Sequence, residues 1–188
     1  MMEPILNIFS AFGLSASAGL NAYIPILVIA LTAKFTNMIS LNAPWDGMTS
    51  WWIIGLLIVL SLVEFLVDKF PVINHINDIF VQSFVRPTAG AIAFAASTNV
   101  INDIHPILAL AIGLLVSGGV HAVKSAAIRP AVTATTGTTG NIPVSVAEEV
   151  TSTTVSVLSI VVPLAVMIIL VLLFTWVFYR FFLKEKFN

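Results

Sequence analysis

The chain has 188 residues, of which 59% are hydrophobic and only 9% are charged, and its net charge is −1. Soluble domains carry about 25% charged residues, so this much apolar surface does not fit into one soluble core and we expect lipid to be the solvent. The near-neutral charge, without a basic arm, argues against a nucleic-acid partner, and the lack of cysteine excludes disulfides and thiolate metal sites.

Six apolar stretches are candidates for crossing a bilayer, which takes about 20 residues of helix. They lie at 5–33, 50–70, 84–98, 104–128, 142–158 and 159–183. The N-terminal stretch has neither a basic leader nor a small-residue cleavage site, so we expect it to be a retained span and not a signal peptide. The sequence therefore predicts an all-α membrane protein with about six transmembrane helices.

The first stretch carries small residues, an asparagine and a proline at its centre, in SASAGLNAYIP (15–25). Part of it, SAGLNAY (17–23), returns 100 residues later as SGGVHAV (117–123), and SLVE (61–64) returns as SVAE (145–148). An odd number of spans separates the first pair, which is typical of an inverted repeat with broken helices meeting at the midplane. The alternative is that these stretches are small-residue packing faces, and both interpretations can hold together.

The repeat predicts two three-helix halves, 1–100 and 101–188, within one membrane domain. The second stretch begins with tryptophans typical of an interface and carries Ser61, Glu64 and Asp68 on one helical face. A structural ion pair of Glu64 with Lys124 or Arg129 is the alternative to a role in a solute pathway. The third stretch is short, and we expect either a tightly packed span or a re-entrant segment.

The fourth stretch places Ser117, His121 and Lys124 on one face, where His121 is either a packed histidine or a group that handles protons or ligands. The fifth is too polar to face lipid, so we expect other helices to surround it. Its adjacent glutamates, Glu148 and Glu149, are either solvated at the interface or split, with at most one facing the centre.

Ionisable groups inside a bilayer are costly and persist mostly where they face a polar interior, so we expect these stripes to share one. Arg86 and Arg129, each followed by proline, are expected to mark helix boundaries, and Asn141 and Ser145 to cap the fifth stretch. The pathway or binding residues are predicted to be Ser17, Asn21, Ser61, Glu64, Asp68, Ser117, His121, Lys124, Glu148 and Glu149, with Arg86, Arg129, Asn141 and Ser145 in support.

We expect no enzyme, because no nucleophile or metalloprotease motif occurs and the three histidines are scattered. No cofactor is expected, and metal ligands stay unassigned. The first functional hypothesis is a small transporter or channel for an ion or small solute, working as a homo-oligomer within membrane lipid. The second is a non-transporting scaffold, assembly factor or lipid-interacting protein whose buried charges pair and seal the interior.

Six spans with a cytoplasmic N-terminus put seven of the eight lysines and arginines on the cytoplasmic side and only Lys34 outside. The positive-inside rule therefore predicts a multi-pass protein of the inner (plasma) membrane with both termini in the cytoplasm.

Several of these residues resemble the pattern of an uncharacterised bacterial membrane family, domain of unknown function 4126. The similar blocks are SAGLNAYIP, then Glu64, Asp68, Lys69, Pro71 and Asp78, then RPTAGA (86–91), then His121, Lys124 and Arg129, and finally Asn141, Ser145, Glu148 and Glu149. The connector departs from the family, reading TTGTTGN where the family tends to read Ser-Pro-Glu-Pro. The resemblance implies an integral membrane protein and the same polar residues, but no activity.

Overall fold

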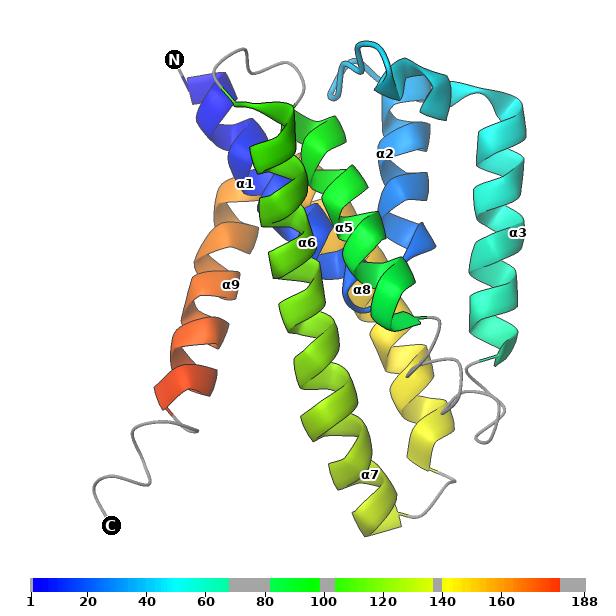
Figure 1. The fold of residues 1–188 in the computed structure, drawn as a ribbon, viewed down its shortest axis with the longest axis vertical. Helices are drawn as coiled ribbons and strands as arrows, with labels where there is room; N and C mark the ends of the chain where they lie inside the picture. The colour runs from blue at the N-terminus through cyan, green and yellow to red at the C-terminus, as the bar shows by residue number, and fades with distance from the viewer. Residues whose placement is uncertain (1, 68–81, 99–103, 137–139, 180–188) are drawn as a thin grey trace.

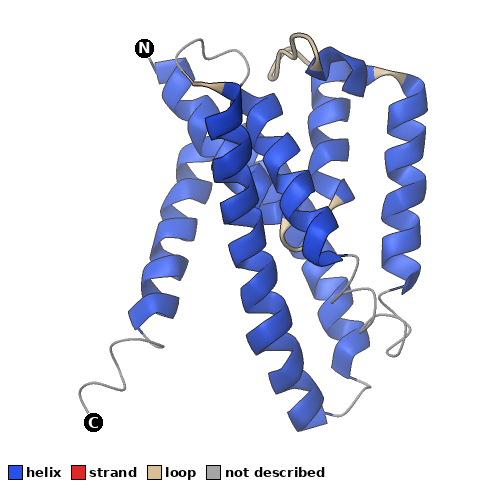
Figure 2. Cartoon of the chain, viewed as in Figure 1, coloured by secondary structure: helices blue, strands red, loops and turns tan. Residues whose placement is uncertain are grey.

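The structure is a computed structural model that describes residues 2–67, 82–98, 104–136 and 140–179. These residues form helices and connections and no β-strand (Figures 1 and 2). The elements in chain order are α1 (Met2–Ala18), α2 (Tyr23–Phe35), the 3-10 turn η1 (Trp45–Thr49), α3 (Trp51–Val67), α5 (Ser83–Thr98), α6 (Pro106–Val123), a π-helical turn (Lys124–Ile128), α7 (Arg129–Thr136), α8 (Asn141–Val161) and α9 (Pro163–Phe178).

The first apolar stretch is two helices and not one span. The chain leaves α1 at Ala18, turns through residues 19–22, and runs back as α2 toward the end of the molecule where α1 began (Figure 1). A glycine and an asparagine occupy this turn, residue types that favour turns over helix interiors. The single span predicted at 5–33 is therefore wrong, and a break lies at the segment that the sequence singled out.

The centre of the bundle is built from α1, α5 and α6, which pack closely because small residues line their contacts. A Cβ added to Gly90 would lie 2.1 Å from the Ser117 Cβ, and one added to Gly113 would lie 2.4 Å from the Gly90 carbonyl oxygen. The C-terminal half of α5, from Ala89 to Thr98, is buried apart from the partly exposed Ile92. The third stretch is thus a short, tightly packed helix, one of the two alternatives.

Helix α8 crosses beside α1 with a stripe of buried serines, at positions 145, 152, 156 and 159. Its opposite face is open: Val146, Val150, Val157 and Leu158 are each at least 40% exposed. The expectation that other helices surround this segment is therefore wrong. The buried serines share one face, and the open side carries these apolar residues together with the exposed Thr151, Thr153 and Thr154.

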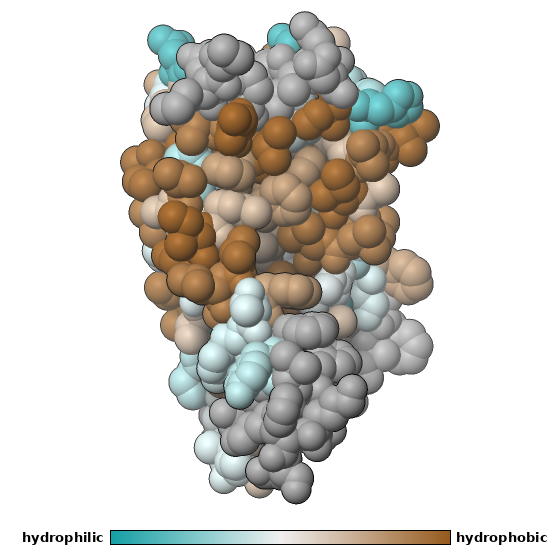
Figure 3. Space-filling view, turned by 90° about the vertical axis from the view of Figure 1, so that its left-hand side faces the viewer, coloured by the Kyte–Doolittle hydropathy of each residue, from teal (hydrophilic) through white to brown (hydrophobic). Residues whose placement is uncertain are grey.

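The outside of the molecule carries many exposed apolar side chains, while charged side chains are buried inside it beside apolar clusters. Trp52 is 90% exposed and Phe174 72%, while Arg86 is fully buried and Lys124 only 1% exposed. Figure 3 shows a broad hydrophobic belt on the face that carries α9, with hydrophilic atoms at the upper end and paler residues toward the lower end. Pro106–Thr136 and Ile142–Val161 are long and apolar enough to cross a bilayer, which suggests a membrane protein.

The turn at residues 19–22 also changes the expected topology. In Figure 1 the N-terminal end of α1 and the C-terminal end of α9 lie at opposite ends of the bundle. A bilayer perpendicular to the long axis would separate these two helix ends, and the cytoplasmic placement of both termini stays a prediction. The six-span inverted repeat is not confirmed, because the stretch matching the break, Ser117–Val123, lies inside the continuous helix α6.

Candidate polar site at the break between α1 and α2

The break between α1 and α2 lies in the interior and is stabilised by its own asparagine. The Asn21 Oδ1 accepts hydrogen bonds from the backbone N–H groups of Tyr23 (3.1 Å) and Ile24 (3.0 Å). It therefore caps the start of α2, whose first N–H groups have no partner within the helix. On the other side, a Cβ at Gly19 would lie 2.6 Å from the Ser117 carbonyl oxygen, so the break rests directly against α6.

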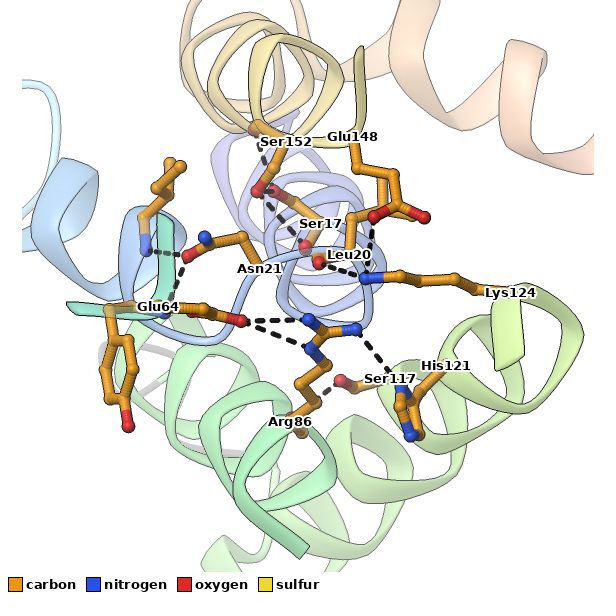
Figure 4. A network of polar contacts seen from close by, with 12 residues as sticks. Ser17, Leu20, Asn21, Glu64, Arg86, Ser117, His121, Lys124, Glu148 and Ser152 are labelled. Atoms are coloured by element: carbon orange, nitrogen blue, oxygen red, sulfur yellow. Dashed lines mark hydrogen bonds and ion pairs between the residues drawn. The ribbon is translucent and has the colours of Figure 1, made fainter. Parts of the chain in front are cut away.

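Arg86 forms the centre of the first group of buried charges (Figure 4). Its Nη2 lies 2.9 Å and its Nε 3.3 Å from the Glu64 Oε1, and its Nη1 lies 3.3 Å from the His121 Nδ1. The Ser117 hydroxyl donates to the Arg86 carbonyl oxygen at 2.7 Å. Arginine suits this place because its planar guanidinium donates in several directions and keeps its charge when buried. The group joins α3, α5 and α6.

The ion pair of Glu64 differs from the one predicted. The expected partner was a basic or polar side chain of the second half, Lys124, Arg129 or His121, whereas the salt bridge is made with Arg86 of the same half. The link to the second half runs through the guanidinium to His121. Gly90 and Gly113 let α5 approach α6 closely. This close approach places the Arg86 side chain in the interior of the bundle.

Lys124 forms the centre of the second group. Its Nζ lies 2.9 Å from the Glu148 Oε2 and donates to the Leu20 carbonyl oxygen at 3.1 Å. The Arg129 Nη2 lies 2.9 Å from the same carboxylate oxygen. Lys124 begins the π-helical turn, a local widening of the helix that is often found at functional sites. The group joins the break to α6, α7 and α8.

Serine hydroxyls attach α1 to α8 beside these charges. The Ser17 Oγ lies 2.8 Å from the Ser152 hydroxyl and 2.7 Å from the Ser156 hydroxyl, and 2.8 Å from the Ser152 carbonyl oxygen. The Ser152 hydroxyl in turn contacts the Ser17 carbonyl oxygen at 3.2 Å. All three serines are at most 1% exposed. Buried hydroxyls need such partners, so this contact fixes how α1 lies on α8.

The structure therefore brings most of the predicted residues together around the break. The residues in direct polar contact there are Ser17, Asn21, Glu64, Arg86, Ser117, His121, Lys124, Arg129 and Glu148. Ser61 lies one turn before Glu64, and Ser145 is buried on the α8 stripe. Asn141 begins α8, Glu149 is partly buried next to Glu148, and Asp68 lies outside the described residues.

Sequence reasoning missed two features of the site. Arg86 was interpreted as a helix boundary and placed only among the supporting residues, although it is the buried ion-pair partner of Glu64. The signal was its position four residues before Gly90, on the small-residue face of α5. The second is a backbone atom, the Leu20 carbonyl oxygen, which no side-chain pattern can reveal. Ser152 and Ser156 were visible as a stripe but were not placed in the site.

An apolar groove of about 300 Å³ lies outside this polar centre, between α2, α3 and α5. Tyr23, Leu57 and Ala89 are among its lining residues. Within the described residues, no group of three or more histidine, aspartate or glutamate side chains has the arrangement of a metal site. Salt bridges and hydroxyl contacts dominate the polar interactions of the described interior.

Fold and site together define a class: an all-helical protein with an apolar exterior and a buried ion-paired centre at a helix break. The chain belongs to the family described as Domain of unknown function (DUF4126), whose model matches residues 8–183. The resemblance noted in the sequence is thereby confirmed. No curated protein and no solved structure matches the chain.

Proposed function

We propose that this protein is a small membrane transporter whose solute, an ion or small polar molecule, passes through the polar centre at the α1–α2 break. The supporting observation is the placement of Arg86 and Lys124, both at most 1% exposed, against carboxylates at an interrupted helix. Buried charges in a bilayer are a large cost and usually mark ion or substrate paths. Broken helices recur at transporter binding sites, because their ends supply partial charges and free backbone groups that bind ions and substrates.

The charged residues hold together elements that a transport cycle would have to move. Glu64 links α3 to α5, and Glu148 links α8 to α6 and α7. Helix α3 is otherwise exposed along most of its length, with only Ile54, Leu57 and Glu64 buried. Opening a path beside α3 therefore requires the release of one ion pair and little apolar packing.

A second candidate function is a sealed scaffold or lipid-interacting protein, and the pairing of the buried charges favours it. Charges that are paired with one another can simply neutralise the interior. Measured flux decides between the two candidates.

The test is uptake of a panel of ions and small polar solutes into proteoliposomes. We expect the native protein to conduct at least one solute above empty liposomes and Glu64→Gln to abolish that flux. The exposed carboxylate of Asp46 provides the matched control, so Asp46→Asn should transport normally. Circular dichroism and gel filtration check that each variant is folded. A native protein that moves none of these solutes, combined with a lowered melting temperature for Glu64→Gln, supports the scaffold instead.

A further inference from the structure

Lys124 occupies a position that is unusual for a lysine. Its side chain is 1% exposed, and its ammonium donates to the carbonyl oxygen of Leu20, in the turn that follows the end of α1 at Ala18. Lysines normally keep their ammonium in water, even when the stem of the side chain is buried. Here the ammonium is held inside the bundle by a carbonyl oxygen and a carboxylate from two different elements.

These contacts are the ones that bind a free cation at a broken helix. The C-terminal end of a helix carries partial negative charge, and in transporters the carbonyls at such ends coordinate the transported or coupling cation. The Glu148 Oε2 supplies the anionic ligand at 2.9 Å. The oxygens that would bind a sodium or an ammonium ion are therefore occupied by an ammonium that the chain itself provides.

The other charged groups around Lys124 come from each neighbouring element. Arg129 of α7 shares the Glu148 oxygen, His121 lies one turn earlier on α6, and Arg86 of α5 lies behind His121. Glu149 follows Glu148 on α8. The connection between α1 and α2, Gly19–Ala22, contains no ionisable side chain. Glu148 thus keeps a cationic partner in Arg129 when Lys124 is absent or uncharged.

We propose that the Leu20 carbonyl oxygen and the Glu148 carboxylate form a monovalent cation site whose resident occupant is the ammonium of Lys124. The next step rests on the proposed transport function: the ammonium loses and regains a proton, and this replaces the binding and release of a metal ion. The proton passes to water on one side, the neutral amine no longer holds the site, and a proton taken up from the other side restores it. The coupling ion of transport is the proton.

The first experiment tests the site without any measurement of transport. Lys124→Ala removes the ammonium and leaves space for propylammonium, which carries the missing atoms. We expect propylammonium to raise the melting temperature of purified Lys124→Ala in a saturable way, by about 3–6 °C at tenfold over its dissociation constant. Tetramethylammonium, which has no N–H donor, should not do so at equal ionic strength.

Lys34→Ala is the matched control. The Lys34 ammonium also donates to a backbone carbonyl, that of Thr49, but it lies over the Trp51 ring, and no carboxylate among the described residues forms an ion pair with it. Propylammonium should leave the melting temperature of that variant unchanged. If Lys124→Ala does not fold, its folded yield with and without propylammonium replaces the melting temperature. Equal values with and without propylammonium would overturn the cation site.

The second experiment tests the coupling. Arginine keeps the positive charge but does not release a proton in proteins, so Lys124→Arg should fold and lose flux driven by a pH gradient. Native flux should not change when sodium is replaced by choline. Persistence of pH-driven flux in Lys124→Arg refutes the coupling. Absence of any native flux refutes the transport function alone, because the propylammonium result then still decides the site.

Discussion

Arg86 shows why residue type matters more than charge in this interior. Three of its nitrogens are used at once, Nε and Nη2 on Glu64 and Nη1 on His121. The side chain reaches these partners on two neighbouring helices from a single position on α5. A lysine at the same position has a single nitrogen and no planar fork, so both partners would have to approach one point instead of three separate nitrogens.

We therefore expect Arg86→Lys to behave as a disruptive change, although it keeps the charge. It should lower the free energy of unfolding by about 2–4 kcal/mol, because Glu64 would be left with poorer partners in the interior. Lys34→Arg, at a partly exposed position, should change stability by less than about 0.5 kcal/mol. Denaturant titration in detergent measures both. Equal stability of Arg86→Lys and the native protein would show that the guanidinium geometry is unimportant.

At the residue scale the sequence could predict that Glu64 is buried but not which side chain neutralises it. Burial follows from the depth of Glu64 in an apolar stretch, and the side chain is 1% exposed. The partner depends on how α5 rotates against α3, which is decided by the close contact of Gly90 with α6. Such a contact between distant segments leaves no periodic signal in the chain.

At the scale of elements, glycines decide how closely the helices approach. Gly113 sits against the Gly90 carbonyl oxygen, whereas Gly119, on the same helix, has no heavy atom of another element within 4 Å of an added Cβ. The two glycines therefore separate the effect of packing from the effect of helix propensity, which favours alanine over glycine by about 1 kcal/mol.

We expect Gly113→Ala to destabilise the protein by about 1–3 kcal/mol, since the methyl group would force α5 and α6 apart. Gly119→Ala should be neutral or stabilising by up to about 1 kcal/mol. Thermal unfolding followed by circular dichroism compares them. A similar response of both variants would mean that α5 and α6 do not pack through these glycines.

The sequence predicts part of the break at residues 19–22, namely that the helix is interrupted there. Small residues, an asparagine and a proline inside an apolar stretch indicate an interruption. They do not indicate whether the chain continues across the membrane or turns back. That direction is set by contacts made elsewhere, such as the Ser15 hydroxyl on the Gly113 carbonyl oxygen at 2.8 Å, which hold α1 on α6.

At the scale of the whole molecule, the α1–α2 hairpin predicts a topology that differs from the one expected from six spans. The start of α1 and the end of α2 lie at the same end of the bundle, and the end of α7 lies at the other (Figure 1). Lys34 falls at the first end and Lys124 and Arg129 toward the second. The positive-inside rule then puts the N-terminus outside and α7 inside.

Cysteine labelling tests this arrangement directly, because the chain has no native cysteine. A membrane-impermeant thiol reagent added to intact cells should label Met2→Cys and Asn37→Cys, and should reach Ala134→Cys only after the cells are opened. Labelling of Met2→Cys and Asn37→Cys from opposite sides would restore a single span at 5–33 and contradict the hairpin.

The serine contact between α1 and α8 has a consequence for biosynthesis. The partners of Ser17, Ser152 and Ser156, are encoded 135 and 139 residues later in the chain. Helix α1 therefore leaves the ribosome with a hydroxyl whose partners have not yet been made. Until α8 has been synthesised, α1 has to remain near water, the insertion machinery or provisional neighbours, so the α1–α2 hairpin reaches its final place only after α8 has been made.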